Sequence, residues 1–217
     1  MIILTSQIDK DKRILKTIKE SLQDDKMFLF IASDRENLKG NIEYMNKIKN
    51  FLNQEVKFKK NYILDNRFIE YKDELIENAS LIFLAGGHLP SSNKFYNDIN
   101  LKESLKNFKG ILTGESAGSM NMANIVYAPP EYDYERIDPN YEKYLKGLDL
   151  CNINIFPHLN WYINDKGLMD IVIKDSNDID IIGLLDGSYI TIDNDIKIHG
   201  ESYLFRKEKI YKITNNK

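Results

Sequence analysis

The sequence predicts an α/β fold, with a doubly wound and mostly parallel sheet, helices on both faces of the sheet, and antiparallel hairpins near the C-terminus. Short apolar runs alternate with segments of helical periodicity through the first half of the chain, which implies parallel strands joined by right-handed crossovers. Residues 81–85 are continuously apolar, as is typical of strands covered on both faces. Residues 189–213 alternate apolar and polar side chains between turns, which indicates hairpins.

The first half of the chain is expected to supply alternating strands and helices. The strands are the apolar runs at residues 2–4, 27–32, 56–64, 81–85 and 110–113. The helices are expected at residues 14–22, 36–52, 70–77, 92–108 and 119–126. Ile14, Leu15 and Ile18 share one helical face, and Ser33-Asp34 is a suitable N-cap for the second helix.

The second half begins with a long excursion, residues 127–144, that contains three prolines and five tyrosines. Surface loops of this length inside a domain are usually functional or mobile. A strand at residues 153–156, a helix at 166–174 and a strand at 179–185 are expected next. The remaining strands are expected at residues 189–192, 196–198, 203–205 and 210–213, as hairpins that close one edge of the sheet.

Composition narrows the class of protein. The chain has 217 residues, a formal charge of -3 and 42% hydrophobic residues, which is enough for one domain over residues 1–217 with its own core. The interspersed charges argue against nucleic acid as a partner, and no apolar run approaches the ~18 residues of a membrane span. Because Cys151 is the single cysteine and no secretory signal is present, we expect a cytoplasmic protein without disulfide bonds.

The candidate nucleophile is Ser116, at the centre of residues 114–118, whose sequence Gly-Glu-Ser-Ala-Gly has the pattern G-x-S-x-G. An apolar strand precedes this segment and a helical segment follows it, which is the context of a nucleophile elbow. Small residues on both sides of the serine allow a sharp turn that lifts its oxygen out at the end of the strand, beside backbone N–H groups that can stabilise an oxyanion. The alternative interpretation is an ordinary glycine-lined turn between a strand and a helix.

A serine nucleophile needs a base, and the chain has three histidines. His88 follows a buried strand and a pair of glycines, and His158 follows another strand, so both are expected at the rim where active sites of such sheets lie. The spacing of the sequence does not choose between these two. His199 lies among the hairpins and is expected to be an edge-strand residue.

The base in turn needs an acid that orients it. Asp186 is the best placed, because residues 181–185 deliver it to the end of a strand, although an Asp-Gly pair also marks an ordinary turn. Asp133 in the long excursion and Glu115 on the elbow are competitors. We expect the Glu115 side chain to point away from the pocket of Ser116 if the turn is tight.

Other residues near these strand ends are candidates for the pocket. Gly86 and Gly87 allow close approach of the backbone to a reacting oxygen, and a second oxyanion N–H is expected from this loop. Asn160 and Trp161, directly after His158, are candidate substrate-binding residues, although Trp161 also fits a loop anchor. No dinucleotide, phosphate-loop or zinc motif is present, so we expect neither a cofactor nor a metal.

Taken together, these segments resemble the peptidase E and cyanophycinase family of serine peptidases, within the class I glutamine amidotransferase-like superfamily. The matching pieces, in order, are residues 84–87 (Leu-Ala-Gly-Gly), 114–119 (Gly-Glu-Ser-Ala-Gly-Ser), 146–150 (Lys-Gly-Leu-Asp-Leu), 157–158 (Pro-His) and 183–188 (Gly-Leu-Leu-Asp-Gly-Ser), with a further similarity at residues 4–6 (Leu-Thr-Ser). The matching pieces span about half of the chain, and their shared order is more specific than the elbow motif alone.

The resemblance implies a catalytic triad of Ser116, His158 and Asp186, with the backbone N–H groups of Gly87 and Ala117 as the oxyanion hole. It thereby favours His158 over the other histidine at the rim. The implied activity is hydrolysis of short peptides through an acyl-enzyme, and dipeptides with an N-terminal Asp are one substrate class that it suggests.

Three features depart from the family pattern. Relatives usually carry Glu where this chain has Asp186, and Asn or Asp is common where it has His88. An N-terminal Asp also requires a cation, and the loop after His158 supplies Lys166 but no Arg. The sequence therefore leaves two other interpretations open, namely a noncatalytic binding protein and an esterase or acyltransferase that uses the same serine. The expected partner is a small peptide, and an exposed sheet edge is compatible with a homodimer.

Overall fold

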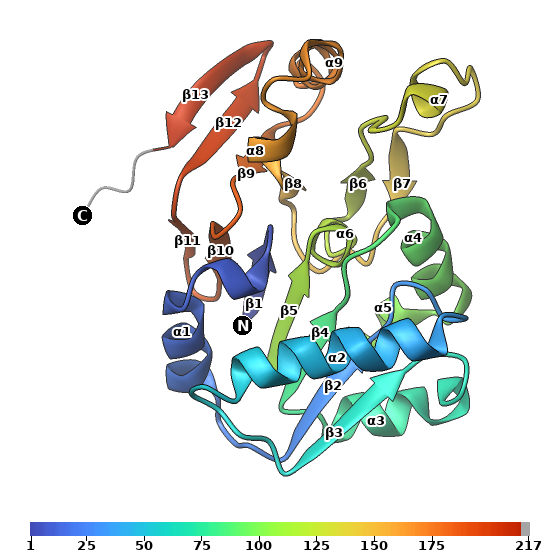
Figure 1. Ribbon diagram of the computed structural model, residues 1–217, viewed down its shortest axis with the longest axis vertical. Helices are drawn as coiled ribbons and strands as arrows, with labels where there is room; N and C mark the ends of the chain where they lie inside the picture. Colours follow the sequence, from blue (N-terminus) through green and yellow to red (C-terminus); the bar gives the residue numbers. More distant parts are fainter. Residues whose placement is uncertain (214–217) are drawn as a thin grey trace.

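The structure is a computed structural model that describes residues 1–213. A seven-stranded sheet occupies one half of the molecule, and a smaller sheet lies beyond the carboxyl ends of its parallel strands (Figure 1). The large sheet comprises β1 (Ile2–Thr5), β2 (Met27–Ile31), β3 (Lys60–Leu64), β4 (Leu81–Leu84), β5 (Ile111–Glu115), β10 (Tyr189–Ile192) and β11 (Ile196–His199). Their order is β11-β10-β1-β5-β4-β2-β3, and β1 to β5 all pair in parallel.

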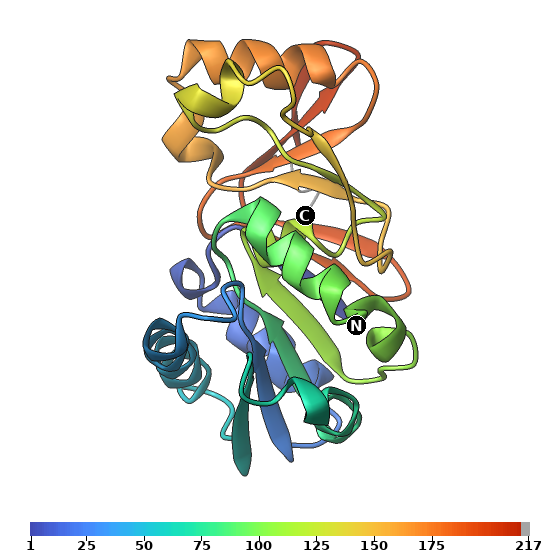
Figure 2. The ribbon, with the colours of Figure 1, turned by 90° about the vertical axis from the view of Figure 1, so that its right-hand side faces the viewer.

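Helices cover both faces of the large sheet, which confirms the doubly wound α/β prediction (Figure 2). One face is covered by α1 (Arg13–Ser21) and α2 (Leu38–Leu52), and the other by α3 (Lys72–Asn78), α4 (Leu89–Asp98) and α5 (Leu101–Leu105). Strand β2, which lies between β4 and the edge strand β3, shows why its residues are continuously apolar. Phe28 and Phe30 point into the core under the first pair of helices, whereas Leu29 and Ile31 point into the other core, and all four are fully buried.

The smaller sheet differs from the expected arrangement of the C-terminal hairpins. It comprises β8 (Asn154–Phe156), β9 (Ile181–Leu184), β12 (Ser202–Arg206) and β13 (Lys209–Ile213), in the order β13-β12-β9-β8. Only β10 and β11 extend the large sheet, as antiparallel strands beside β1. The hairpin β12-β13 pairs with β9 instead, because Phe205 packs with Phe156 and with Leu168 of α9 (Lys166–Asp175) in a separate core.

The segment after the elbow also differs from its predicted helix at residues 119–126. Helix α6 (Ala117–Met120) lasts one turn, and the chain then forms β6 (Ile125–Tyr127), which pairs with β7 (Tyr144–Lys146). The helix stops because the carbonyl oxygens of Asn121, Met122 and Asn124 accept hydrogen bonds from backbone N–H groups of residues 147–151. The excursion between β6 and β7 contains the short helix α7 (Asp133–Arg136).

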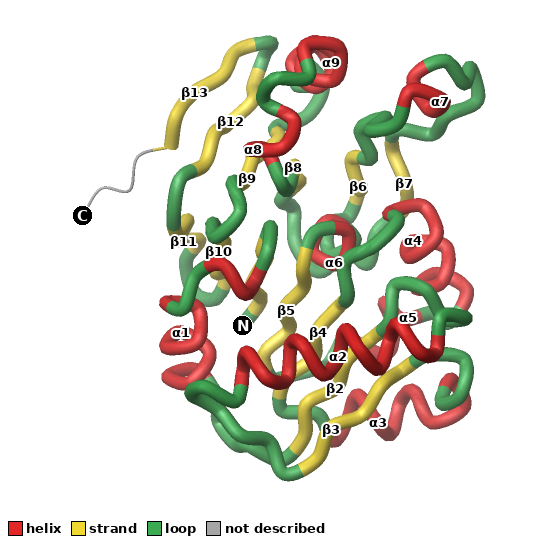
Figure 3. Tube along the Cα trace, viewed as in Figure 1, coloured by secondary structure: helices red, strands yellow, loops and turns green. Residues whose placement is uncertain are grey.

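Smaller differences concern element ends. The strand expected at residues 56–64 begins at Lys60, and the helix expected at 92–108 is divided into α4 and α5 by Asn100, which has a left-handed backbone with φ 51°. Two 3-10 helices, η1 (Ile8–Lys10) and η2 (Ile69–Tyr71), and the short helix α8 (Leu159–Tyr162) complete the set (Figure 3). No helix within residues 1–213 has the length and apolarity needed to cross a membrane.

Candidate active site

The predicted site residues follow strand ends in both sheets. In the large sheet, β1 leads to Ser6, β4 leads to the glycine pair, and β5 leads to Ser116. In the smaller sheet the parallel neighbours β8 and β9 lead to His158 and Asp186. A cavity of about 360 Å³ lies at this junction, and its lining includes Gly86, Gly87, His88, Ser116, Ala117, His158 and Trp161. The architecture thus places side chains from two sheets around one cavity.

Ser116 occupies a strained turn. Its backbone has φ 50° and ψ -121°, which an L-residue other than glycine rarely adopts, and its N–H donates to the Thr5 carbonyl at 3.0 Å. Gly118 is required by packing, because a Cβ at this position would collide with the carbonyl oxygen of Leu84. The small residues of the motif therefore let α6 press against β4 while Ser116, half-buried, lines the cavity.

Two backbone N–H groups beside Ser116 are available to a ligand. Gly87 and Ala117 both line the cavity, and within residues 1–213 neither N–H donates to another group of the protein. Gly87 has φ 154°, and a Cβ there would lie 2.5 Å from the Ser33 hydroxyl, so both its backbone and its surroundings require glycine. This arrangement is suited to binding an oxyanion.

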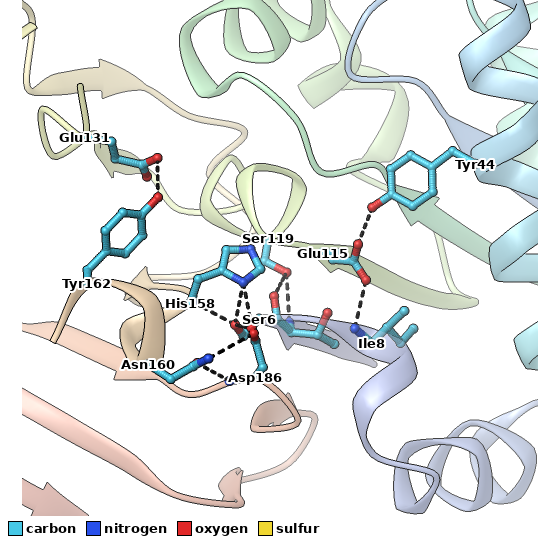
Figure 4. A network of polar contacts seen from close by, with 11 residues as sticks. Ser6, Ile8, Tyr44, Glu115, Ser119, Glu131, His158, Asn160, Tyr162 and Asp186 are labelled. Carbon is cyan, nitrogen blue, oxygen red and sulfur yellow. Dashed lines mark hydrogen bonds and ion pairs between the residues drawn. The ribbon is translucent and has the colours of Figure 1, made fainter. Parts of the chain in front are cut away.

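His158 is paired with Asp186. Its Nδ1 lies 2.7 Å from Asp186 Oδ1, and each side chain is 13% exposed (Figure 4). An ionised Asp186 accepts a hydrogen bond, so the proton of a neutral His158 is on Nδ1 and Nε2 is left as the basic nitrogen. The ring of Trp161 stacks on the imidazole with centroids 4.1 Å apart, and this tryptophan is otherwise 60% exposed.

Asp186 is held as a carboxylate. Partial burial raises its pKa, but hydrogen bonds from Asn160, Ser6 and His158 outweigh that effect and leave the pKa below its ordinary value. Asn160 Nδ2 donates to Oδ2 at 3.2 Å, and Asn160 Oδ1 accepts from the Asp186 N–H at 2.8 Å. Asn160, expected in the substrate pocket, thus lies outside the cavity lining and contacts the acid instead.

Ser6 is a further member of this network that motif analysis did not single out as functional. Its hydroxyl donates to Asp186 Oδ1 at 2.8 Å and accepts from the His158 N–H at 2.8 Å, and Ser6 is fully buried. It therefore connects β1 of the large sheet to both residues of the smaller sheet. The only sequence signal for it is the similarity of residues 4–6 to the family pattern.

The competing residues have other contacts. His88 is at the cavity rim, with Nδ1 2.7 Å from the Ser91 hydroxyl, and does not contact Asp186. Asp133 is exposed, pairs with Arg136 and is not among the residues that line the cavity. His199 lies on the edge strand β11, with Nε2 3.1 Å from the Thr191 hydroxyl.

Glu115 is buried and is among the residues that line the cavity, but its carboxylate is bound by the protein. The Tyr44 hydroxyl donates to Oε1, and the Ile8 N–H donates to Oε2 at 2.8 Å. Burial raises the pKa of Glu115, although both hydrogen bonds act in the opposite direction. The pKa of Tyr44 is also raised, mainly by burial and secondly by the nearby charge of Glu115. Its carboxylate is therefore committed to holding the elbow against α2 and η1.

The hydroxyl of Ser116 and the imidazole of His158 line the same cavity without a hydrogen bond between them in the described part of the chain. Such contacts are often long in unliganded hydrolases and shorten when substrate binds. Within residues 1–213, no three His, Cys, Asp or Glu side chains are grouped so that they could hold a metal ion. The arrangement therefore offers a nucleophile, an imidazole oriented by a carboxylate, and two free N–H donors.

Comparison with known proteins gives one family. The sequence model of peptidase family S51 matches residues 1–199. The structure is similar to that of a candidate peptidase E protein from Listeria monocytogenes EGD-e, with a TM-score of 0.70 and 16% sequence identity, over 91% of this chain and 96% of that one. At this identity the structural likeness concerns the fold. No curated protein matches the chain.

Proposed function

The chain belongs to peptidase family S51 and is a serine peptidase, and from this premise we propose that it hydrolyses short peptides with Ser116 as nucleophile, His158 as general base and Asp186 as the acid that orients it. The observation that carries the proposal is the pairing of Asp186 at 2.7 Å with His158, whose side chain lines the same cavity as the strained elbow of Ser116. Gly87 and Ala117 supply the oxyanion hole.

The reaction begins when Ser116 Oγ attacks the carbonyl carbon of the scissile bond while His158 Nε2 takes the hydroxyl proton. The carbonyl oxygen becomes negative and is bound by the N–H groups of Gly87 and Ala117. His158 then donates the proton to the leaving amine, the C–N bond breaks, and Ser116 carries the acyl group. Water attacks this ester with His158 again as base, which releases the carboxylic acid and restores Ser116.

Asp186 stabilises the imidazolium that forms during both steps. Aspartate is a methylene shorter than the glutamate usual in relatives. Ser6 and Asn160 offset the shorter reach, because they bind the carboxylate from two sides while its Oδ1 lies 2.7 Å from the imidazole. The shorter acid is thus compatible with an active triad.

The substrate is a short peptide in this proposal, because the cavity of about 360 Å³ accommodates a few residues at most. The cavity does not favour an N-terminal Asp. The described residues that line the cavity include no Lys or Arg to pair with an aspartate side chain, and Lys166 is exposed on α9.

Hydrolysis of a dipeptide and tripeptide library tests the proposal, with release of free amine as the measurement. Ser116→Ala should lower kcat/KM by at least ~10³-fold, since triad members act as a unit. Its circular dichroism and thermal unfolding should match those of the natural protein. Equal hydrolysis by Ser116→Ala would reject the proposed nucleophile, and turnover of esters without any peptide cleavage would instead identify an esterase.

A further inference from the structure

Trp161 is placed in a way that burial in a core does not explain. It is the single tryptophan of the chain, it is 60% exposed, and it lines the cavity that contains Ser116. A ring of this size is usually held in place by the apolar surface that it buries. In the described part of the chain, the aromatic contact of Trp161 is instead its stack on the imidazole of His158, with centroids 4.1 Å apart and ring planes inclined by 17°.

The chain brings the two rings together within one helical turn. His158 is the N-cap of α8 and has a left-handed backbone, with φ 54° and ψ 31°, which a residue other than glycine adopts only when its surroundings hold it. Ser6 accepts from the His158 N–H at 2.8 Å, and the His158 carbonyl accepts from the Trp161 N–H at 2.8 Å. Residues three positions apart in a helical turn share a face, so the indole lies over the imidazole. The buried Leu159 anchors this turn in the core of the smaller sheet.

Two contacts in different directions then fix the imidazole. The hydrogen bond from Nδ1 to Asp186 Oδ1 lies in the plane of the ring, and by itself it leaves the ring free to tilt out of that plane. The indole contacts a face of the ring and opposes the tilt. Because the ring is otherwise held only at Cβ and Nδ1, a tilt would move Nε2, the atom that takes the Ser116 proton in the proposed reaction.

The stack also favours the charged form of the imidazole over the neutral form. The face of an indole carries negative charge density and attracts a cation placed over it. In the proposed reaction His158 becomes an imidazolium when it takes the hydroxyl proton. The attraction is therefore stronger in the transition state than in the resting protein, and an interaction of this kind raises kcat.

We propose that Trp161 is a positioning residue, which holds the imidazole of His158 in the orientation that reaches Ser116 and stabilises the imidazolium that forms there. The inference rests on the proposed function, because it concerns the base of that reaction. The indole acts through His158 rather than on the scissile bond. It supplies a second constraint on an imidazole whose orienting acid, Asp186, is the shorter aspartate.

Replacement of Trp161 tests this role through kcat for the best substrate of the peptide library. Trp161→Leu removes the stack, and kcat should fall about 5- to 30-fold while KM changes less than about threefold. The rate at which a fluorophosphonate labels Ser116 should fall by a similar factor, because labelling uses the same base. Trp161→Phe keeps an aromatic face over the imidazole and should keep kcat within about threefold of the natural protein.

Tyr134→Leu is the matched control. Tyr134 is 63% exposed and stacks on Tyr132 with centroids 5.4 Å apart, but it is not among the residues that line the cavity. Its replacement should leave kcat within about twofold of the natural protein. An unchanged kcat in Trp161→Leu, a change in KM alone, or an equal loss of kcat in Trp161→Phe would overturn the positioning role.

The emission of Trp161 tests the contact without a substrate. Because the chain has one tryptophan, emission excited selectively over tyrosine comes from this residue alone. A protonated imidazole in contact with an excited indole accepts an electron from it and quenches the emission, whereas a neutral imidazole quenches it much less. The emission should therefore rise from about pH 5 to pH 8, the range in which histidines titrate.

Three variants assign this rise in emission. His158→Gln should abolish it, whereas His88→Gln, which replaces the other histidine of the cavity lining, should preserve it. Glu131 and Glu135 also line the cavity, and burial raises the pKa of Glu131, so Glu131→Gln is a third variant and should preserve the rise as well.

The two measurements separate this inference from the proposed function. An emission that does not respond to His158→Gln would show that the rings are not stacked and would overturn the inference, even in a protein that hydrolyses peptides. A response in a protein that neither hydrolyses peptides nor is labelled at Ser116 would support the placement of the imidazole by Trp161 and reject the proposed function. Hydrolysis that requires Ser116 but is unaffected by Trp161→Leu would do the reverse.

Discussion

Replacement of Ser6 by alanine tests how the two sheets position the imidazole. Ser6 is fully buried, and its hydroxyl makes one hydrogen bond to the Asp186 carboxylate and accepts another from the His158 N–H, each at 2.8 Å. Ser6→Ala removes the first bond and leaves the N–H without a partner. The remaining contacts of Asp186 are with the His158 ring and with Asn160.

The magnitude follows from these two bonds. Loss of a hydrogen bond to a charged acceptor costs ~1.5–3 kcal/mol, and an unpaired buried N–H costs ~1–3 kcal/mol. Because a water molecule or a small shift replaces part of each bond, the free energy of unfolding should fall by ~2–4 kcal/mol. The imidazole stays paired with Asp186 but is held less firmly, so kcat/KM should fall about 10- to 100-fold.

The assay measures peptide hydrolysis between pH 4 and 8 together with unfolding by urea. The depressed pKa of Asp186 contributes stability that is present at neutral pH and is lost as the pH falls through that pKa. Ser6→Ala removes one of the hydrogen bonds that depress the pKa, so the loss of stability on acidification should be smaller and should be complete at a higher pH than in the natural protein. A role limited to packing would lower stability by the same amount at every pH and would leave kcat/KM unchanged.

Ser176→Ala is a matched control. The Ser176 hydroxyl is buried, donates to the Ile173 carbonyl at 2.6 Å and accepts from the Glu208 N–H at 3.1 Å, away from the cavity. It should lose a comparable amount of stability and keep kcat/KM within about twofold of the natural protein. An unchanged activity and pH profile in Ser6→Ala would refute the positioning role of Ser6.

Two further predictions concern the elbow and its support. Gly87→Ala should lower kcat at least about tenfold with a smaller change in KM. The added Cβ would meet the Ser33 hydroxyl and displace the residue 87 N–H, which is one of the two proposed oxyanion donors. Steady-state kinetics that show a change in KM alone would contradict this. Burial raises the pKa of Glu115, so the stability linked to its protonation is present at acid pH and is lost as the pH rises through that pKa. Glu115→Gln cannot ionise, so the free energy of unfolding of this variant minus that of the natural protein should increase from pH 4.5 to pH 7.5, as measured by urea unfolding. The same difference at both pH values would argue against a buried ionised Glu115.

The elbow could be predicted from sequence because its information is local. Five consecutive residues, 114–118, contain the small residues that the turn needs and the serine that it presents. The same holds for the apolar strands around it, which face a core on both sides. Local sequence does not distinguish His158 from His88, because both follow the end of a strand. Apart from the family resemblance, what distinguishes His158 is its contact with Asp186, 28 residues later in the chain.

Other features depend on contacts between distant segments. Ser6 meets residues 152 and 180 positions later in the chain, so no pattern around it indicates its role. The helix expected at residues 119–126 fails because N–H groups from residues 147–151 bind the carbonyls that would have continued it. Glu131 and Glu135 lie in a segment without helical or strand periodicity, so no pattern in the sequence indicates that they line the cavity.

Labelling by a fluorophosphonate probe, followed by intact-mass spectrometry, measures whether Ser116 is an activated nucleophile. We expect one adduct per chain on the natural protein and none on folded Ser116→Ala, because the probe requires a serine whose proton is taken by a neighbouring base. A natural protein that is folded but acquires no adduct, or an adduct that persists in Ser116→Ala, would show that Ser116 is not the activated nucleophile.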